Sequence, residues 1–128
     1  MPSSQQTEIK NLFMREPIRD KGRLEHIIEY AENVEQMIKD VTFEQFNEDK
    51  VLYFAVMKNV EVVGEAAYML SKEFIIMHPQ MPWQQIIGMR HVLVHGYATI
   101  SKLKLWNTAK SDIPALKQQA LLYLKEFE

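Results

Sequence analysis

Apolar residues recur at steps of three and four along most of this chain, the spacing that places side chains on one face of an α-helix. The first stripe predicts an amphipathic helix over about residues 19–41, with its apolar positions at Leu24, Ile27, Ile28, Ala31, Val34, Ile38 and Val41. The opposite face of this segment is charged, so we expect the helix to pack on a core with one side in water.

A second helix is predicted from about residue 47 to residue 73, and its apolar positions extend beyond a single stripe. Such a helix requires burial on more than one side, either at the centre of a bundle or at a subunit interface. Before it, the sequence from Thr42 to Gln45 has the form of a capping box, in which a hydroxyl and an amide satisfy free backbone amides. A short connecting turn is therefore expected there.

Prolines indicate the remaining helix boundaries. Pro82 suits the first position of a third helix, which we expect to run to about Tyr97. A short helix or turn over residues 100–110 follows, and Pro114 precedes a last amphipathic helix. Because no segment alternates with period two, the sequence predicts an all-α bundle of four to five helices in up-and-down order.

Length and composition favour one folded domain. The chain has 128 residues, of which 47% are hydrophobic, enough for a single core. We expect an N-terminal extension over residues 1–16 and a helical-bundle domain over residues 17–128. Cysteine is absent, which excludes thiolate chemistry. Neither a secretory signal nor a membrane-spanning run is recognisable, so the expected location is the cytoplasm, without membrane association.

The charge is unevenly distributed although the net charge is only −2. No Asp or Glu occurs between Phe74 and Ser111, and the basic residues of this window are Arg90, Lys102, Lys104 and Lys110. A locally cationic segment favours a phosphate-bearing ligand. The alternative is a solvated helix face that happens to lack acids.

The candidate chemistry lies in this window. On a helix, His91 and His95 are one turn apart on one face, whereas Arg90 lies about 140° around from His95 at 100° per residue. One ideal helix cannot direct all three groups at one atom. Gly96 permits the helix to end there, and a cleft shared with a second subunit can gather groups from adjacent faces.

Imidazole proton transfer combined with guanidinium charge stabilisation suits cleavage of RNA by its own 2′-hydroxyl, without a metal or another cofactor. The expected product is a 2′,3′-cyclic phosphate. Two alternatives remain at this point. His91 and His95, at i and i+4, can share a metal ion, or they can be satisfied polar residues at one end of the bundle.

The sequence Arg90, four residues, His95, one residue, Tyr97 resembles the signature of the HEPN-domain toxins of the HepT type. The similarity extends from about Ile18 to Phe127. Further positions that match the family pattern in order and spacing are Arg19-Asp20, Gly64-Glu65-Ala66, Pro82-Trp83 and Met89-Arg90.

The resemblance implies a HEPN-type bundle that forms a homodimer or a higher oligomer, with two copies of the motif in one cleft. It implies a metal-independent ribonuclease in which Arg90 and His95 are catalytic. The implied partner is a minimal nucleotidyltransferase antitoxin of the MntA type, in a type VII toxin-antitoxin pair. In such pairs AMP is transferred to the tyrosine that matches Tyr97, which adds bulk and negative charge beside the catalytic histidine.

One position departs from the family pattern, because His91 stands where asparagine is common. A second imidazole can titrate near neutrality, so His91 is a candidate auxiliary acid or base. Because of this departure, an alternative function remains, in which the chain is a non-catalytic helical binding partner of a nucleotidyltransferase. His26 and His78 lie outside the motif and are interpreted as ordinary surface or loop residues.

Overall fold

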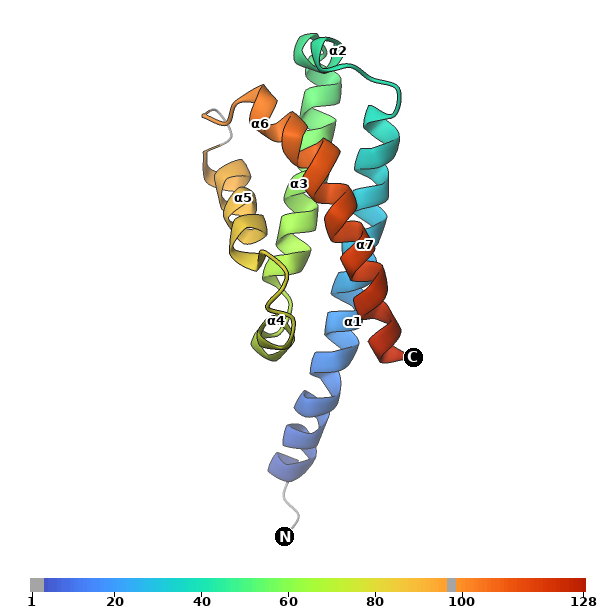
Figure 1. The fold of residues 1–128 in the computed structure, drawn as a ribbon. Helices are drawn as coiled ribbons and strands as arrows, with labels where there is room; N and C mark the ends of the chain where they lie inside the picture. Colours follow the sequence, from blue (N-terminus) through green and yellow to red (C-terminus); the bar gives the residue numbers. More distant parts are fainter. Residues whose placement is uncertain (1–3, 97–98) are drawn as a thin grey trace.

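The computed structural model describes residues 4–96 and 99–128, and every regular element in these ranges is helical. Four longer helices run alternately up and down (Figure 1): α1 (Ser4–Ile38), α3 (Lys50–Tyr68), α5 (Trp83–His95) and α7 (Ile113–Leu124). The shorter elements are α2 (Phe43–Glu48), α4 (Lys72–Met77), α6 (Lys102–Asn107), the π-helical turn η1 (Thr108–Asp112) and the 3₁₀ turn η2 (Lys125–Phe127). The predicted all-α, up-and-down bundle is therefore confirmed.

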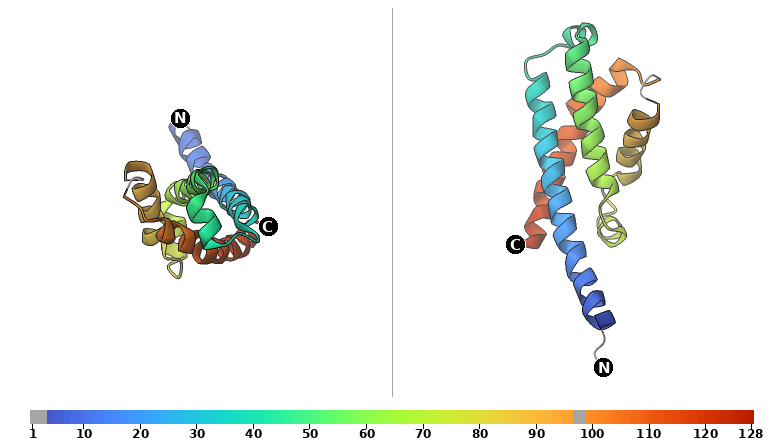
Figure 2. Two further views of the ribbon diagram at one scale, coloured as in Figure 1. Left: turned by 90° about the horizontal axis from the view of Figure 1, so that it is seen from above. Right: turned by 180° about the vertical axis from the view of Figure 1, so that it is seen from behind.

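The core lies where α1, α3 and α7 meet, and α5 packs on the side of α3 away from α1 (Figure 2). The predicted apolar stripe of the first helix faces this core. Its fully buried members are Leu24, Ile27, Ala31 and Val34. The second predicted helix is buried on more than one side, as expected, because α3 packs against both α1 and α5. Figure 1 also shows that the N-terminal part of α1 extends beyond the other helices.

The first helix differs from its predicted bounds at both ends. Its backbone is helical from Ser4 and continues through residue 17, so the proposed division at residue 16 falls within one helix. At its C-terminal end the helix stops at Ile38 rather than near Val41. Asp40 has a φ of 59°, in the left-handed region, and a left-handed residue ends an α-helix. The division into extension and domain stays a prediction.

Side-chain caps begin four of the described helices, which are α2, α3, α4 and α6. The predicted capping box at Thr42 is confirmed, since its hydroxyl accepts from the Gln45 N–H at 3.1 Å while the Gln45 side chain accepts from the Thr42 N–H. Asp49 caps α3 and Ser101 caps α6, each by accepting one backbone N–H with its side chain. Each cap satisfies a backbone amide that has no partner within its own helix.

The prediction of one helix over residues 47–73 is wrong at its C-terminal end. Helix α3 ends at Tyr68, and a separate helix, α4, begins at Lys72. Ser71 caps α4 by accepting from the Phe74 N–H. The carboxylate of Asp20, which is buried, accepts from both the N–H and the hydroxyl of Ser71, at 2.8 and 2.7 Å. This pair of bonds stabilises the break, since it satisfies a buried charge with two donors.

Later boundaries also differ in detail. Pro82 is the residue before α5 rather than its first helical residue. The segment from Lys102 to Leu124 is helical throughout, because η1 joins α6 to α7 without a loop. Pro114 stands in the first turn of α7, directly after η1, and has no N–H to donate to the preceding turn.

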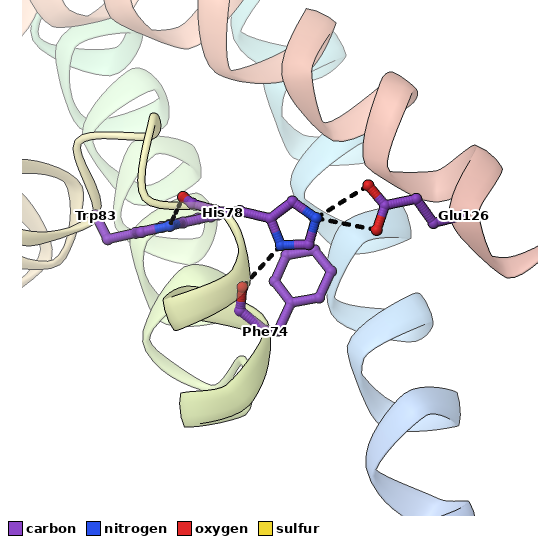
Figure 3. Close-up of polar contacts among 4 residues, drawn as sticks. All are labelled: Phe74, His78, Trp83 and Glu126. Atoms are coloured by element: carbon purple, nitrogen blue, oxygen red, sulfur yellow. Dashed lines mark hydrogen bonds and ion pairs between the residues drawn. The ribbon is translucent and has the colours of Figure 1, made fainter.

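His78 was expected to be an ordinary surface or loop residue. It does lie in the connection after α4, but its side chain is buried and bonded rather than exposed (Figure 3). Its Nδ1 lies 2.7 Å from the Phe74 carbonyl oxygen, and its Nε2 lies 2.9 and 3.0 Å from the Glu126 carboxylate oxygens. Trp83 Nε1 donates to the His78 carbonyl at 2.8 Å.

Tyr123 lies beside this histidine, with its ring centroid 4.2 Å from that of the imidazole. Burial, followed by the negative charge of Glu126, raises the pKa of Tyr123. These contacts join the C-terminal turn to the start of α5.

None of the helices in the described part of the chain has both the length and the hydrophobicity needed to cross a bilayer.

Candidate active site

The candidate site lies on the C-terminal half of α5. Gly96 is the C-cap of this helix, and its N–H donates to the Val92 carbonyl at 2.7 Å. The N–H and the hydroxyl of Thr99 both donate to the Gly96 carbonyl. The helix therefore ends directly after His95, which confirms the predicted role of Gly96.

Arg90 points from α5 towards α3. Its Nε donates to Glu65 Oε2 at 2.5 Å, and its Cζ lies 4.7 Å from the centroid of the Tyr68 ring. The Arg90 side chain is only 21% exposed. The bond to Glu65 uses Nε, which leaves both terminal amino groups of the guanidinium without a hydrogen-bond partner among the described residues. Two parallel N–H donors suit bidentate contact with a phosphate.

The backbones of α3 and α5 approach closely at Gly64. A Cβ atom added there would lie 2.5 Å from the Cβ of Arg90 and 3.3 Å from its Cα. No side chain fits at that distance, so glycine at this position allows α5 to seat Arg90 against α3. The close approach fixes where the Arg90 side chain begins.

We expect Gly64→Ala to reduce the free energy of unfolding by about 1–3 kcal/mol, because the new methyl group forces α3 and α5 apart. Urea denaturation monitored by circular dichroism measures this change. Gly88→Ala on α5 is the matched control, since a Cβ there meets nothing within 4 Å. Alanine favours the helix over glycine, so this control should be slightly more stable than wild type. Equal stability of Gly64→Ala and wild type would contradict the assigned contact.

His91 and His95 lie together on the solvent side of α5. Their ring centroids are 4.7 Å apart, and both residues are exposed. The prediction that they share one face, one turn apart, is confirmed. Arg90 instead packs against α3, so a single α5 presents the guanidinium and the imidazoles on different sides, as the helical spacing indicates.

The cationic window is less positive in space than in sequence. Glu65, from α3, supplies a carboxylate to Arg90. Lys102 donates to the Asn47 carbonyl at 2.8 Å and lies over the ring of Tyr53. Lys110 lies over the ring of Trp106 instead of joining the other cations. Arg90, Lys102 and Lys110 each lie against a different aromatic ring, and Arg90 is the cation that shares α5 with the histidines.

Metal binding by the histidine pair finds little support in the geometry. Within residues described by the structure, no three His, Cys, Asp or Glu side chains are grouped so as to hold an ion. His91 and His95 thus lack a third protein ligand among them, whereas protein metal sites commonly use three or more.

A groove of about 820 Å³ runs along another side of α5, between this helix and the segment of α6, η1 and α7. Its floor is apolar and includes Val63, Met89 and Leu116. Helix α5 therefore packs against α3, while the groove separates it from α7.

Tyr97, the predicted AMP acceptor, lies outside the described residues. Tyr68 is a neighbour of the site that sequence reasoning missed. It is the last residue of α3 and is 52% exposed, although its helix is otherwise rich in buried apolar residues. One indication of Tyr68 was available in the sequence, because it is an aromatic residue off the buried stripe at the C-terminal end of α3. Nothing local in the sequence indicates that it meets Arg90.

Comparisons with known proteins agree with these observations. A family model described as ribonuclease HepT-like matches residues 27–121. A protein of Thermococcus cleftensis named "Probable ribonuclease HepT" is 39% identical over 97 residues, covering 76% of this chain and 88% of the relative. A candidate RNase of Caldanaerobacter subterraneus subsp. tengcongensis is 38% identical over 96 residues, covering 75% of this chain and 86% of the relative.

A candidate RNase of Methanocaldococcus jannaschii is 34% identical over 113 residues, covering 88% of this chain and 97% of the relative. No solved structure matches the chain significantly. The family model spans most of the chain, and its relatives are matched over nearly their whole length. The chain therefore belongs to the HepT-like ribonuclease family, which confirms the family predicted from the sequence.

Proposed function

We propose that this ribonuclease cleaves RNA by attack of the 2′-hydroxyl, without a metal ion, with Arg90 and His95 as its catalytic residues. The observation that carries the proposal is the arrangement on α5. Arg90 is held beside Glu65 and Tyr68, its terminal amino groups have no hydrogen-bond partner among the described residues, and His91 and His95 are exposed on another side of the same helix.

The chemistry needs one base, one acid and one group that stabilises charge. The 2′-oxygen attacks phosphorus and loses its proton to a base, while the bond from phosphorus to the 5′-oxygen breaks and that oxygen gains a proton. His95 serves as one of these proton-transfer groups, and His91 is the auxiliary candidate for the other. Arg90 stabilises the negative charge that develops on the phosphoryl oxygens. The products are a 2′,3′-cyclic phosphate and a 5′-hydroxyl.

A homodimer would complete this site. Arg90 and His95 lie on different sides of one α5, so a cleft formed by two copies of the chain brings facing groups to one phosphate. Equilibrium sedimentation of the purified chain measures the oligomeric state. The proposal requires a dimer or a multiple of it at the concentration at which RNA is cleaved.

The reaction itself is tested with a single-stranded RNA in the presence of EDTA. We expect cleavage under these conditions, and fragments whose mass shows 2′,3′-cyclic phosphate ends. A matched RNA with 2′-deoxy sugars should remain intact, because it lacks the attacking group. Cleavage that requires added metal, or fragments with 3′-hydroxyl ends, would contradict the mechanism.

We also propose that the chain is the toxin of a type VII toxin-antitoxin pair, in which a minimal nucleotidyltransferase antitoxin transfers AMP to Tyr97. Support comes from family membership and from the position of Tyr97, two residues after His95 in the sequence. AMP at this position adds negative charge where the RNA phosphate binds.

Intact-mass and peptide analysis of the chain, expressed with and without its nucleotidyltransferase, tests this regulation. We expect one or more AMP groups on the peptide that contains Tyr97, and loss of RNA cleavage by the modified protein. Tyr97→Phe should stay unmodified and active. A chain that binds the nucleotidyltransferase but neither carries AMP nor cleaves RNA would support the alternative, a non-catalytic binding partner.

A further inference from the structure

Tyr68 presents an aromatic ring beside the guanidinium of Arg90. The ring centroid lies 4.7 Å from Arg90 Cζ, and the residue is 52% exposed. Tyr68 ends α3, one helical turn beyond Gly64 and directly after the buried Ala67. The Tyr68 ring therefore contacts the guanidinium of Arg90, and about half of the residue is exposed to solvent.

Packing of the core does not explain this exposed ring. The buried side of α3 contains Val60, Val63 and Ala67, which are at most 3% exposed, and Tyr68 lies outside that group. An arginine that contacts one face of an aromatic ring restricts the ring and leaves its other face for a further planar group to stack on. The combination is typical of surfaces that bind single-stranded nucleic acids.

We propose that Tyr68 is a stacking platform for the nucleobase next to the scissile phosphate of the RNA substrate. This inference rests on the proposed function, in which the terminal amino groups of Arg90 hold that phosphate. A nucleobase joined to a phosphate at Arg90 lies within reach of a ring that contacts the same guanidinium. The substrate is then single-stranded at this position, because stacking requires a base that is free of its own helix.

Stacking tolerates every base, since each base has a π face. The proposed platform therefore contributes affinity and position with little sequence preference at the flanking nucleotide. It also places the base on the α3 side of Arg90, away from the exposed histidines on α5.

Phe54 offers a matched control on the same helix. It is 54% exposed, about the same as Tyr68 at 52%, and its ring packs against Tyr53 rather than an arginine. At a rise of about 1.5 Å per residue it lies about 21 Å from Tyr68 along α3. Comparison of Phe54→Ala with Tyr68→Ala therefore separates the general effect of losing an exposed aromatic ring from the specific effect of losing the Tyr68 ring.

The test measures binding of a non-cleavable 2′-O-methyl RNA and cleavage of the matching RNA. Tyr68→Ala should bind about 5- to 100-fold more weakly than wild type. Tyr68→Phe and Phe54→Ala should bind as wild type does, because the first keeps the ring and the second removes a distant one. Thermal unfolding and sedimentation of each variant verify that its fold and oligomeric state are unchanged.

A second RNA, with an abasic nucleotide next to the cleavage site, separates stacking from positioning of Arg90. Wild type and Tyr68→Ala should bind and cleave this RNA equally, since there is no base to stack. A defect of Tyr68→Ala that persists with the abasic RNA would overturn the inference, and so would equal binding of the intact RNA. If wild type binds RNA but does not cleave it, the proposed mechanism fails while the binding comparison still decides the role of Tyr68.

Discussion

Replacement of Arg90 by alanine is expected to lower kcat/KM for RNA cleavage by about 10²- to 10³-fold, the usual effect of removing a donor that stabilises developing charge. The guanidinium is held by Glu65 and Tyr68, so its terminal amino groups are already placed before the substrate binds. Alanine retains the Cβ atom that packs against Gly64, and the contact between α3 and α5 should survive. Single-turnover cleavage by purified variants measures the effect.

Two further variants sharpen this prediction. Arg90→Lys keeps the charge but loses the planar fork, so it should recover only part of the lost rate. Lys39→Ala removes an exposed cation beyond the end of α1 and should cleave as wild type does. If Arg90→Ala retains its fold and the wild-type rate, the guanidinium is not part of the catalytic machinery.

Replacement of His95 by alanine is expected to lower kcat by about 10²- to 10⁴-fold, the contribution of a positioned general acid or base. His95 is exposed at the last helical position of α5, where its imidazole is accessible to a substrate and makes few contacts that stabilise the fold. The variant should therefore unfold at the wild-type temperature while its rate falls. Rapid-quench measurement under saturating RNA separates this loss from weaker binding.

His26→Ala is the matched control for His95. His26 is likewise exposed on a helix, and its ring contact is with Tyr30 of the same helix. A comparable loss of rate in both histidine variants would indicate a general effect on the protein rather than catalysis by His95.

Local signals in the sequence were sufficient for much of the fold. The apolar spacing located the buried face of α1, and the capping box at Thr42 is present as predicted. The helical spacing also placed His91 and His95 on one face, with Arg90 on another. These features depend on residues within one or two helical turns of each other, which is the range that a sequence pattern describes.

The errors came from contacts between residues far apart in the chain. The break between α3 and α4 is stabilised by Asp20 acting on Ser71, and His78 is buried because Glu126 reaches it from the C-terminal turn. Periodicity of a single helix contains no information about such partners. The early end of α1 has a different, local cause, because Asp40 is left-handed while the apolar Val41 after it continues the stripe in the sequence.

The candidate site shows the same division. The position of Arg90 and His95 on α5 followed from the motif, but the surroundings of Arg90 did not. Glu65 and Tyr68 come from α3. Glu65 belongs to the segment that matched the family pattern, where an acid that contacts the motif's basic groups could be inferred, whereas nothing in the sequence indicated that Tyr68 would meet this arginine. The charge of the site is therefore a property of the packed helices and not of the segment that contains the motif.

Arg90 and His95 are proposed to act as one catalytic unit, and the double variant Arg90→Ala/His95→Ala tests whether they do. Single-turnover cleavage of one RNA in EDTA is compared among wild type, both single variants and the double variant. Residues that act together in one transition state show strongly non-additive losses. We predict that the double variant is about as slow as the slower single variant. Losses that multiply, or equal rates for all four proteins, would contradict the account.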